Sequence, residues 1–173
     1  MIFISETPDP NFIEPLIVLN AEPKKERTMT AFDYIYKHHV DDADWFLNVD
    51  DSTYVIVENL RYLLASWDSA LPMYFGGRET TEGQRHVKGG TSYIISKKAL
   101  QIFGERQTGE CVEDRLQGQA VAKCLESLGV RAADSRDVLG RRRMHHIPHG
   151  SPKQRKYFLP SLEHGEEQVS GGL

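Results

Sequence analysis

Two acidic side chains directly follow a short apolar run. Asp50 and Asp51 come after Trp45–Val49, and Ser52 follows them. Adjacent carboxylates repel each other unless a cation offsets their charge. Their oxygens suit hard dications such as Mg²⁺ or Mn²⁺, which can in turn hold a diphosphate. The pair therefore indicates a metal site, although an acidic turn that stabilises the start of the next helix has the same pattern.

A second acidic pair, Glu113 and Asp114, lies at the head of a segment with apolar residues at helical spacing. A carboxylate there can act as a general base, which takes the proton from a sugar hydroxyl as that hydroxyl attacks an anomeric carbon. Acidic residues that only stabilise the first turn of a helix are the alternative. Gly89 and Gly90 permit close approach of a ligand, but on spacing alone an ordinary turn is the better explanation.

Three further groups are less specific signals. Cys111 and Cys124 can form a disulfide or stay as buried thiols, and their spacing favours neither. The histidine-rich run 145–149 suits Zn²⁺, but no cysteine or acidic partner is near it, so a surface loop is favoured. The basic run Arg141–Arg143 is interpreted as a solvated loop.

Composition indicates one ordinary globular domain. The chain has 173 residues, of which 39% are hydrophobic and 27% charged, with a net charge of −4. These values do not fit a general nucleic-acid binder. No apolar run reaches the roughly 20 residues that span a bilayer, and the first residues do not form a signal peptide. We therefore expect no membrane span in this chain.

Apolar periodicity predicts strands that alternate with helices. The expected strands are Met1–Ser5, Leu16–Asn20, Trp45–Val49 as a buried central strand, Met73–Phe75, Tyr93–Ile95 and Val130–Ala133. The expected helices are Lys24–Val40, Ile56–Trp67 capped by Ser52 or Thr53, Ser96 to about Gly104 with Ser96 as cap, and Val112–Leu128 ended by Gly129. The alternation predicts an α/β sandwich with a mostly parallel sheet. Ligands of such sheets bind at the carboxyl ends of strands.

Several motifs in order resemble one family. The stretch Asp41–Leu64, which contains both aspartates after the apolar run, resembles the signature of the glycoprotein-N-acetylgalactosamine 3-beta-galactosyltransferases, or core 1 synthases. The segments that resemble the same family further along are Tyr74–Gly76, Gly89–Leu100, Cys111–Asp114 with Cys124, and Ala133–Asp137. The resemblance is specific because unrelated motifs occur in one order. It predicts a partial catalytic domain over residues 1–151 and a loose tail over residues 152–173.

The resemblance implies a GT-A type α/β fold, incomplete in this chain, whose mostly parallel sheet is flanked by helices. It implies inverting transfer of galactose from UDP-galactose to O3 of N-acetylgalactosamine linked to Ser or Thr of a glycoprotein, with Mn²⁺ as cofactor. It also implies a lumenal position at the Golgi membrane, a disulfide between Cys111 and Cys124, and compatibility with a homodimer. The family's membrane anchor and stem are expected to be absent from this chain.

The resemblance also assigns roles by position. Asp50 and Asp51 belong to the metal and nucleotide site, with Ser52 in the third position of the same motif. The residues matched to the donor or acceptor cleft are Gly89 and Gly90, and the matched base is Asp114 with Glu113 beside it.

One departure keeps an alternative open. The family motif usually has three aspartates, and Ser52 occupies the place of the third. A neutral hydroxyl is a poorer ligand for a hard dication than a carboxylate is. A non-catalytic, chaperone-like homologue or an inactive fragment of the family is therefore the alternative to an active transferase.

Overall fold

The centre of the fold is a four-stranded sheet. In the computed structural model, the described residues are 1–5, 7–12, 16–19, 27–50, 53–76, 78–81, 84–87, 92–106, 111, 120–141 and 143–144. The sheet has the order β3-β7-β4-β8. Its strands are β3 (Trp45–Asn48), β7 (Tyr93–Ser96), β4 (Met73–Gly76) and β8 (Arg131–Ala132).

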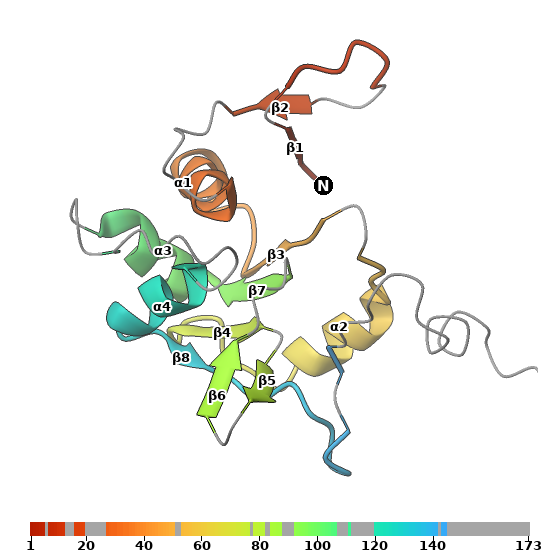
Figure 1. The fold of residues 1–173 in the computed structure, drawn as a ribbon, viewed down its shortest axis with the longest axis vertical. Helices are drawn as coiled ribbons and strands as arrows, with labels where there is room; N and C mark the ends of the chain where they lie inside the picture. The colour runs from red at the N-terminus through yellow and green to blue at the C-terminus, as the bar shows by residue number, and fades with distance from the viewer. Residues whose placement is uncertain are drawn as a thin grey trace, which may run out of the picture.

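Helices cover this sheet (Figure 1), and two small strand pairs form separate two-stranded sheets. The helices are α1 (Arg27–His39), α2 (Val57–Leu64), α3 (Lys97–Glu105) and α4 (Ala120–Ser127). The strands β1 (Phe3–Ser5) and β2 (Leu16–Val18) pair in parallel, and β5 (Arg78–Thr81) pairs with β6 (Gln84–Val87) in antiparallel fashion. None of the helices in the described part of the chain has the length and apolar character needed to cross a bilayer.

The alternation of side chains along the strands creates two apolar layers. Tyr74 and Ile95 face a buried cluster built with α1, α3 and α4. Their neighbours Phe75 and Ile94 face the other side, where they pack with Leu63 of α2. Figure 1 shows α2 on the opposite side of the sheet from α3 and α4. The predicted α/β sandwich is therefore confirmed, and it is consistent with a GT-A-like domain.

Strand direction in the sheet is mixed. β3, β4 and β8 run in one direction, as a mostly parallel sheet requires, but β7 lies between β3 and β4 and runs against both. Parallel neighbours need a long crossover, usually a helix. The chain between β4 and β7 instead contains the antiparallel pair β5–β6. Two of the three strand pairings of the sheet are therefore antiparallel.

Ser96 joins β7 to α3 and is fully buried. Its hydroxyl accepts a hydrogen bond from the backbone N–H of Ala99 at 3.1 Å, which confirms the predicted cap. The same hydroxyl donates to the carbonyl of Leu71 at 2.7 Å. The start of α3 is thereby tied to the segment that enters β4.

Two other helix ends test the sequence predictions. The predicted end of the last helix is confirmed, because Gly129 has a φ of 80° and Val130 N–H donates to the Leu125 carbonyl at 2.9 Å. The predicted cap at Thr53 is wrong, because α2 begins at Val57 and has no side-chain cap. Residues 112–119 of the last predicted helix lie outside the described residues, and α4 accounts for its second half.

The predicted central position of the strand Trp45–Val49 is also wrong for the described sheet. β3 lies at the edge of that sheet, next to β7 alone in its order. Leu47 of β3 is 38% exposed, so the apolar run does not mark burial on both faces. An apolar run of this length fixes the existence of a strand but not its place in the sheet.

The contact between α1 and α3 leaves no room at Gly104. A Cβ on Gly104 would lie 2.1 Å from Cγ of Tyr36. We expect Gly104→Ala to lower the free energy of unfolding by about 2 kcal/mol, because overpacking outweighs the gain of roughly 1 kcal/mol from better helix propensity. Chemical denaturation measures this change. In a Tyr36→Ala background the same substitution should be neutral or stabilising, and an equal loss there would contradict the steric explanation.

Candidate functional site

Four strand ends meet along one edge of the sheet, the edge formed by the carboxyl ends of β3, β4 and β8 and the amino end of β7. Asn48 of β3 and Gly76 of β4 are both in register with Tyr93 of β7. The chain that leaves β3 and β4 therefore lies level with the chain that enters β7. β8 runs parallel to β4, with Ala132 opposite Tyr74, so the chain that leaves β8 reaches the same edge. This is the edge at which ligands of α/β sheets bind.

Asp50 lies at this edge in a tight turn just after β3. The backbone N–H of Thr53 donates to the Asp50 carbonyl at 3.2 Å. The Thr53 hydroxyl donates to Oδ1 of Asp50 at 2.6 Å. The same hydroxyl lies 3.2 Å from Oγ of Ser92, the residue before β7. All three residues are half-buried, so the carboxylate is held in one place beside the sheet.

Among the predicted site residues, the structure describes Asp50. The predicted residues that lie outside the described part of the chain are Asp51, Ser52, Gly89, Gly90, Glu113 and Asp114. Their roles stay predictions. The sequence places the glycine pair shortly before Ser92, and Asp51 and Ser52 between Asp50 and Thr53. The contact between Thr53 and Ser92 thus joins the predicted segment of the two aspartates to the predicted segment of the glycine pair.

The donor chemistry at Asp50 fits one ligand position for a hard dication. Its carboxylate is a hard oxygen ligand, and a hydroxyl hydrogen bond holds Oδ1 in place. Within the described residues no group of three or more His, Cys, Asp or Glu side chains could hold a metal ion. Asp50 would therefore need ligands from outside the described part of the chain to complete a metal site.

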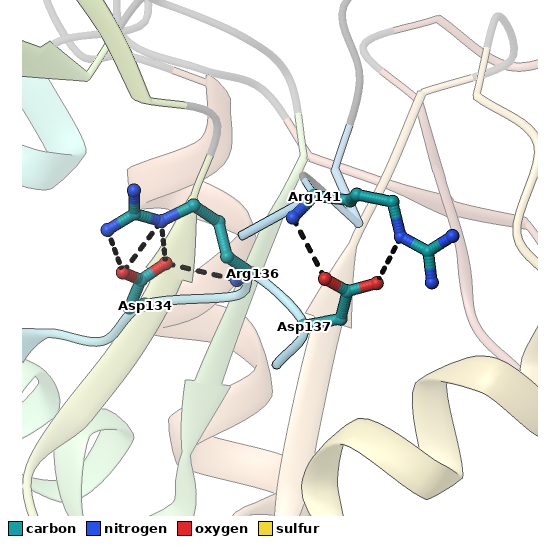
Figure 2. Close-up of polar contacts among 4 residues, drawn as sticks. All are labelled: Asp134, Arg136, Asp137 and Arg141. Atoms are coloured by element: carbon teal, nitrogen blue, oxygen red, sulfur yellow. Dashed lines mark hydrogen bonds and ion pairs between the residues drawn. The ribbon is translucent and has the colours of Figure 1, made fainter. Parts of the chain in front are cut away.

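The chain after β8 folds into two turns closed by arginines. Arg136 Nε donates to Oδ2 of Asp134 at 2.9 Å. Arg141 Nε donates to Oδ2 of Asp137 at 2.6 Å, and Gly140 between them has a φ of 76°. Figure 2 shows each guanidinium directed at its own carboxylate. Each ion pair thus joins residues within this loop, and as exposed pairs they contribute little to stability.

Hydrogen bonds shift the pKa values of two of these groups. The backbone N–H of Arg141 is the main cause that lowers the pKa of the Asp137 carboxyl. The hydrogen bond from Arg136 to Asp134 raises the pKa of that guanidinium. Since the Asp137 pKa is lower in the folded state, its contribution to stability is present above the ordinary carboxyl pKa of about 4 and is lost as the pH falls through the folded value.

Two arginines of the basic run, Arg141 and Arg143, lie in the described part of the chain, and both are exposed. Arg141 is ion-paired with Asp137 of the same loop, and its side chain is 73% exposed. The guanidinium carbon of Arg143 lies 5.6 Å from the ring centroid of Tyr62 on α2. The exposure of both arginines agrees with a solvated loop. The histidine run 145–149 lies outside the described residues.

Sequence reasoning missed the two hydroxyls at the site. Thr53 was considered only as a helix cap, and Ser92 had no role. The spacing Asp50-x-x-Thr53 is a usable signal, since short side chains with this spacing commonly close turns by hydrogen bonds. No sequence signal connects Thr53 with Ser92, because the two residues are 39 positions apart.

Cys111 and Cys124 form a disulfide. Their Cα atoms are 4.8 Å apart, within the usual range for a bridge. Cys124 is only 3% exposed in the core between α4 and the sheet. The bridge therefore fixes one end of the segment that carries Glu113 and Asp114 to the core.

Comparison with known proteins decides the family. The model of the family described as Fringe-like matches residues 18–116. The chain belongs to the Fringe-like family. It is also 34% identical over 154 residues to glycoprotein-N-acetylgalactosamine 3-beta-galactosyltransferase 1 of Xenopus laevis, an alignment that covers 85% of this chain and 42% of that protein. The family resemblance predicted from the motifs is thereby confirmed.

Further relatives are named for other activities. The chain is 26% identical over 133 residues to chondroitin sulfate synthase 3 of Mus musculus, with 66% of this chain and 15% of that protein covered. It is 26% identical over 113 residues to beta-1,3-glucosyltransferase of Mus musculus, with 63% and 23% covered. The chain thus spans less than half the length of each of these relatives. It belongs to a glycosyltransferase family, whose members differ in the sugars that they are named for.

Proposed function

We propose that this Fringe-like domain takes part in inverting transfer of galactose from UDP-galactose to O3 of N-acetylgalactosamine on a glycoprotein. The observation that carries the proposal is the position of Asp50, held by Thr53 at the edge where the chain leaves β3. A carboxylate fixed at this edge suits a nucleotide-sugar site. The name of the Xenopus relative supports galactose as the sugar and N-acetylgalactosamine as the acceptor.

The roles of the residues follow from the charges of the reactants. Asp50 and Asp51, with Ser52, would hold Mn²⁺. When bound, the metal ion would neutralise charge that develops on the UDP leaving group. Asp114, with Glu113 beside it, would take the proton from the acceptor hydroxyl. Gly89 and Gly90 would let the backbone approach the bound sugar or nucleotide closely.

The disulfide fits a place in the lumen of the Golgi. Disulfides persist in oxidising compartments and are rare in the cytosol. The buried bridge between Cys111 and Cys124 therefore supports a lumenal position for this domain. A glycoprotein acceptor in that compartment and a homodimer are parts of the same proposal.

Binding of UDP-galactose tests the proposal directly. Calorimetry of the protein with UDP-galactose should show binding in the presence of Mn²⁺ and much weaker binding in its absence. Transfer to an N-acetylgalactosamine peptide should then be detectable. UDP-glucose and UDP-N-acetylgalactosamine serve as matched donors. A clear preference for either of them would replace galactose in the proposal, and no binding of any donor would refute transferase activity.

Ser52 favours a second candidate function, that of a non-catalytic, chaperone-like homologue. The sequence has only two adjacent carboxylates where the resembled motif has three. We expect Ser52→Asp to increase Mn²⁺ affinity at least about tenfold, because a carboxylate replaces a neutral ligand. Calorimetry measures this change, and Ser52→Asn provides the matched uncharged control. Unchanged Mn²⁺ and UDP-galactose binding in Ser52→Asp would favour the non-catalytic candidate.

A further inference from the structure

The hydroxyls of Thr53 and Ser92 form a hydrogen-bonded chain to Asp50. The Thr53 hydroxyl donates to Oδ1 of Asp50 at 2.6 Å. A hydroxyl has a single hydrogen, so Thr53 can only accept at its second contact. Ser92, at 3.2 Å from the Thr53 oxygen, must therefore be the donor there. The direction of the chain is from Ser92 to Thr53 to Asp50.

This chain connects two segments that the strand order brings together. Asp50 and Thr53 belong to the turn after β3, whereas Ser92 immediately precedes β7 and follows the glycine pair in sequence. β3 and β7 are paired, with Asn48 opposite Tyr93. The sheet thus places the acidic turn and the end of the glycine segment side by side, and the hydroxyl chain is a side-chain connection between them.

From this arrangement we infer that Thr53 and Ser92 are positioning residues for Asp50. They hold its carboxylate in the orientation that a metal ion and a nucleotide diphosphate require, and neither needs to touch the ligand. The inference rests on the proposed function of Asp50. Hydrogen-bond partners of metal ligands commonly change metal affinity by about 10-fold to 100-fold when they are removed, because they fix the ligand's orientation.

Removal of the Thr53 hydroxyl leaves the turn itself in place. The backbone N–H of Thr53 donates to the Asp50 carbonyl at 3.2 Å, and this bond does not depend on the side chain. Thr53→Val keeps the branched shape of the residue and loses only the hydroxyl. Thr53→Ser keeps the hydroxyl and loses only a methyl group. The two variants therefore separate the hydrogen bond from the packing of the residue.

Ser92 should act only through Thr53. Ser92→Ala removes the donor to the Thr53 oxygen and leaves the hydrogen bond from Thr53 to Asp50 possible. Its effect should therefore be smaller than that of Thr53→Val. In the double variant Ser92→Ala should add nothing, because the hydroxyl through which it acts is already absent.

The experiment measures Mn²⁺ binding to the whole protein by electron paramagnetic resonance of free Mn²⁺, with UDP present and absent. We expect the dissociation constant for Mn²⁺ to rise about 10-fold in Thr53→Val and about 3-fold in Ser92→Ala, and to stay near the wild-type value in Thr53→Ser. Circular dichroism of each variant checks that the fold is retained. The double variant should bind as Thr53→Val does.

Each contrary result has one meaning. Wild-type binding of Mn²⁺ that Thr53→Val and Ser92→Ala leave unchanged would overturn the inference and leave the proposed function intact. Ser92→Ala could also weaken Mn²⁺ binding in the Thr53→Val background as much as it does in the wild-type protein. That result would show that Ser92 does not act through the Thr53 hydroxyl. If the wild-type protein binds no Mn²⁺ with or without UDP, both the metal part of the proposed function and this inference are refuted. Should Thr53→Val fail to fold, Ser92→Ala still tests the inference, because unchanged Mn²⁺ binding in that variant would overturn it.

Discussion

Replacement of both cysteines, Cys111→Ser with Cys124→Ala, is expected to lower the free energy of unfolding by about 3–4 kcal/mol. The bridge spans a sequence separation of 13 residues. Closing a loop of this length in the unfolded chain is worth about 3 kcal/mol. Cys124 is 3% exposed, so its truncation also removes buried contacts. The midpoint of thermal unfolding should fall by roughly 6–16 °C for a chain of this size.

Reducing agent supplies the control for this prediction. The wild-type protein should lose most of the same stability in dithiothreitol, whereas the double cysteine variant should be unaffected by it. A wild-type melting temperature that is the same with and without dithiothreitol would show that the bridge contributes nothing to stability. Iodoacetamide labelling before and after reduction confirms whether both thiols are in the bridge.

Asp114→Asn is expected to lower the rate of galactose transfer by about 10²-fold to 10⁴-fold, the range that a general base supplies. Asn has nearly the same shape as Asp but cannot take the proton from an acceptor hydroxyl. Affinity for UDP-galactose should be unchanged, because the base acts only as the acceptor attacks. Single-turnover transfer to an N-acetylgalactosamine peptide measures the rate, and calorimetry measures donor binding.

Glu113→Gln provides the matched control, because it changes the neighbouring carboxylate in the same way. A larger loss of transfer in Glu113→Gln than in Asp114→Asn would exchange the roles of the two residues. A loss of UDP-galactose binding in Asp114→Asn would refute its role as the base and assign it to the donor site.

Local sequence patterns predicted most of the described helices and strands. The apolar run Met73–Phe75 and the cap at Ser96 are in the structure as expected, because both are set by nearby residues. The edge position of β3 and the reversed direction of β7 could not be predicted in this way. They depend on which strands pair across long stretches of chain, and periodicity contains no information on pairing partners.

The candidate site was predictable only where a motif is continuous in sequence. The acidic pair that begins at Asp50 stands out from residue types alone, and it lies within the part of the chain that the Fringe-like model matches. The link between Thr53 and Ser92 needed the register of β3 against β7. Similarly, the pairing of Cys111 with Cys124 was undecided from spacing, since a disulfide and two free thiols fit the same interval.

The order of pairing in the sheet also has a consequence for how this chain is made. β3 ends at Asn48, but its partner β7 begins only at Tyr93. β4 also pairs with β7. A ribosome that has released the chain only as far as α2 has thus exposed β3 without β7. Because β7 joins β3 to β4, the sheet assembles only after translation has passed Ser96. Until then the backbone groups of β3 that pair with β7 are unpaired, and an unpaired apolar strand is a place where another chain can add.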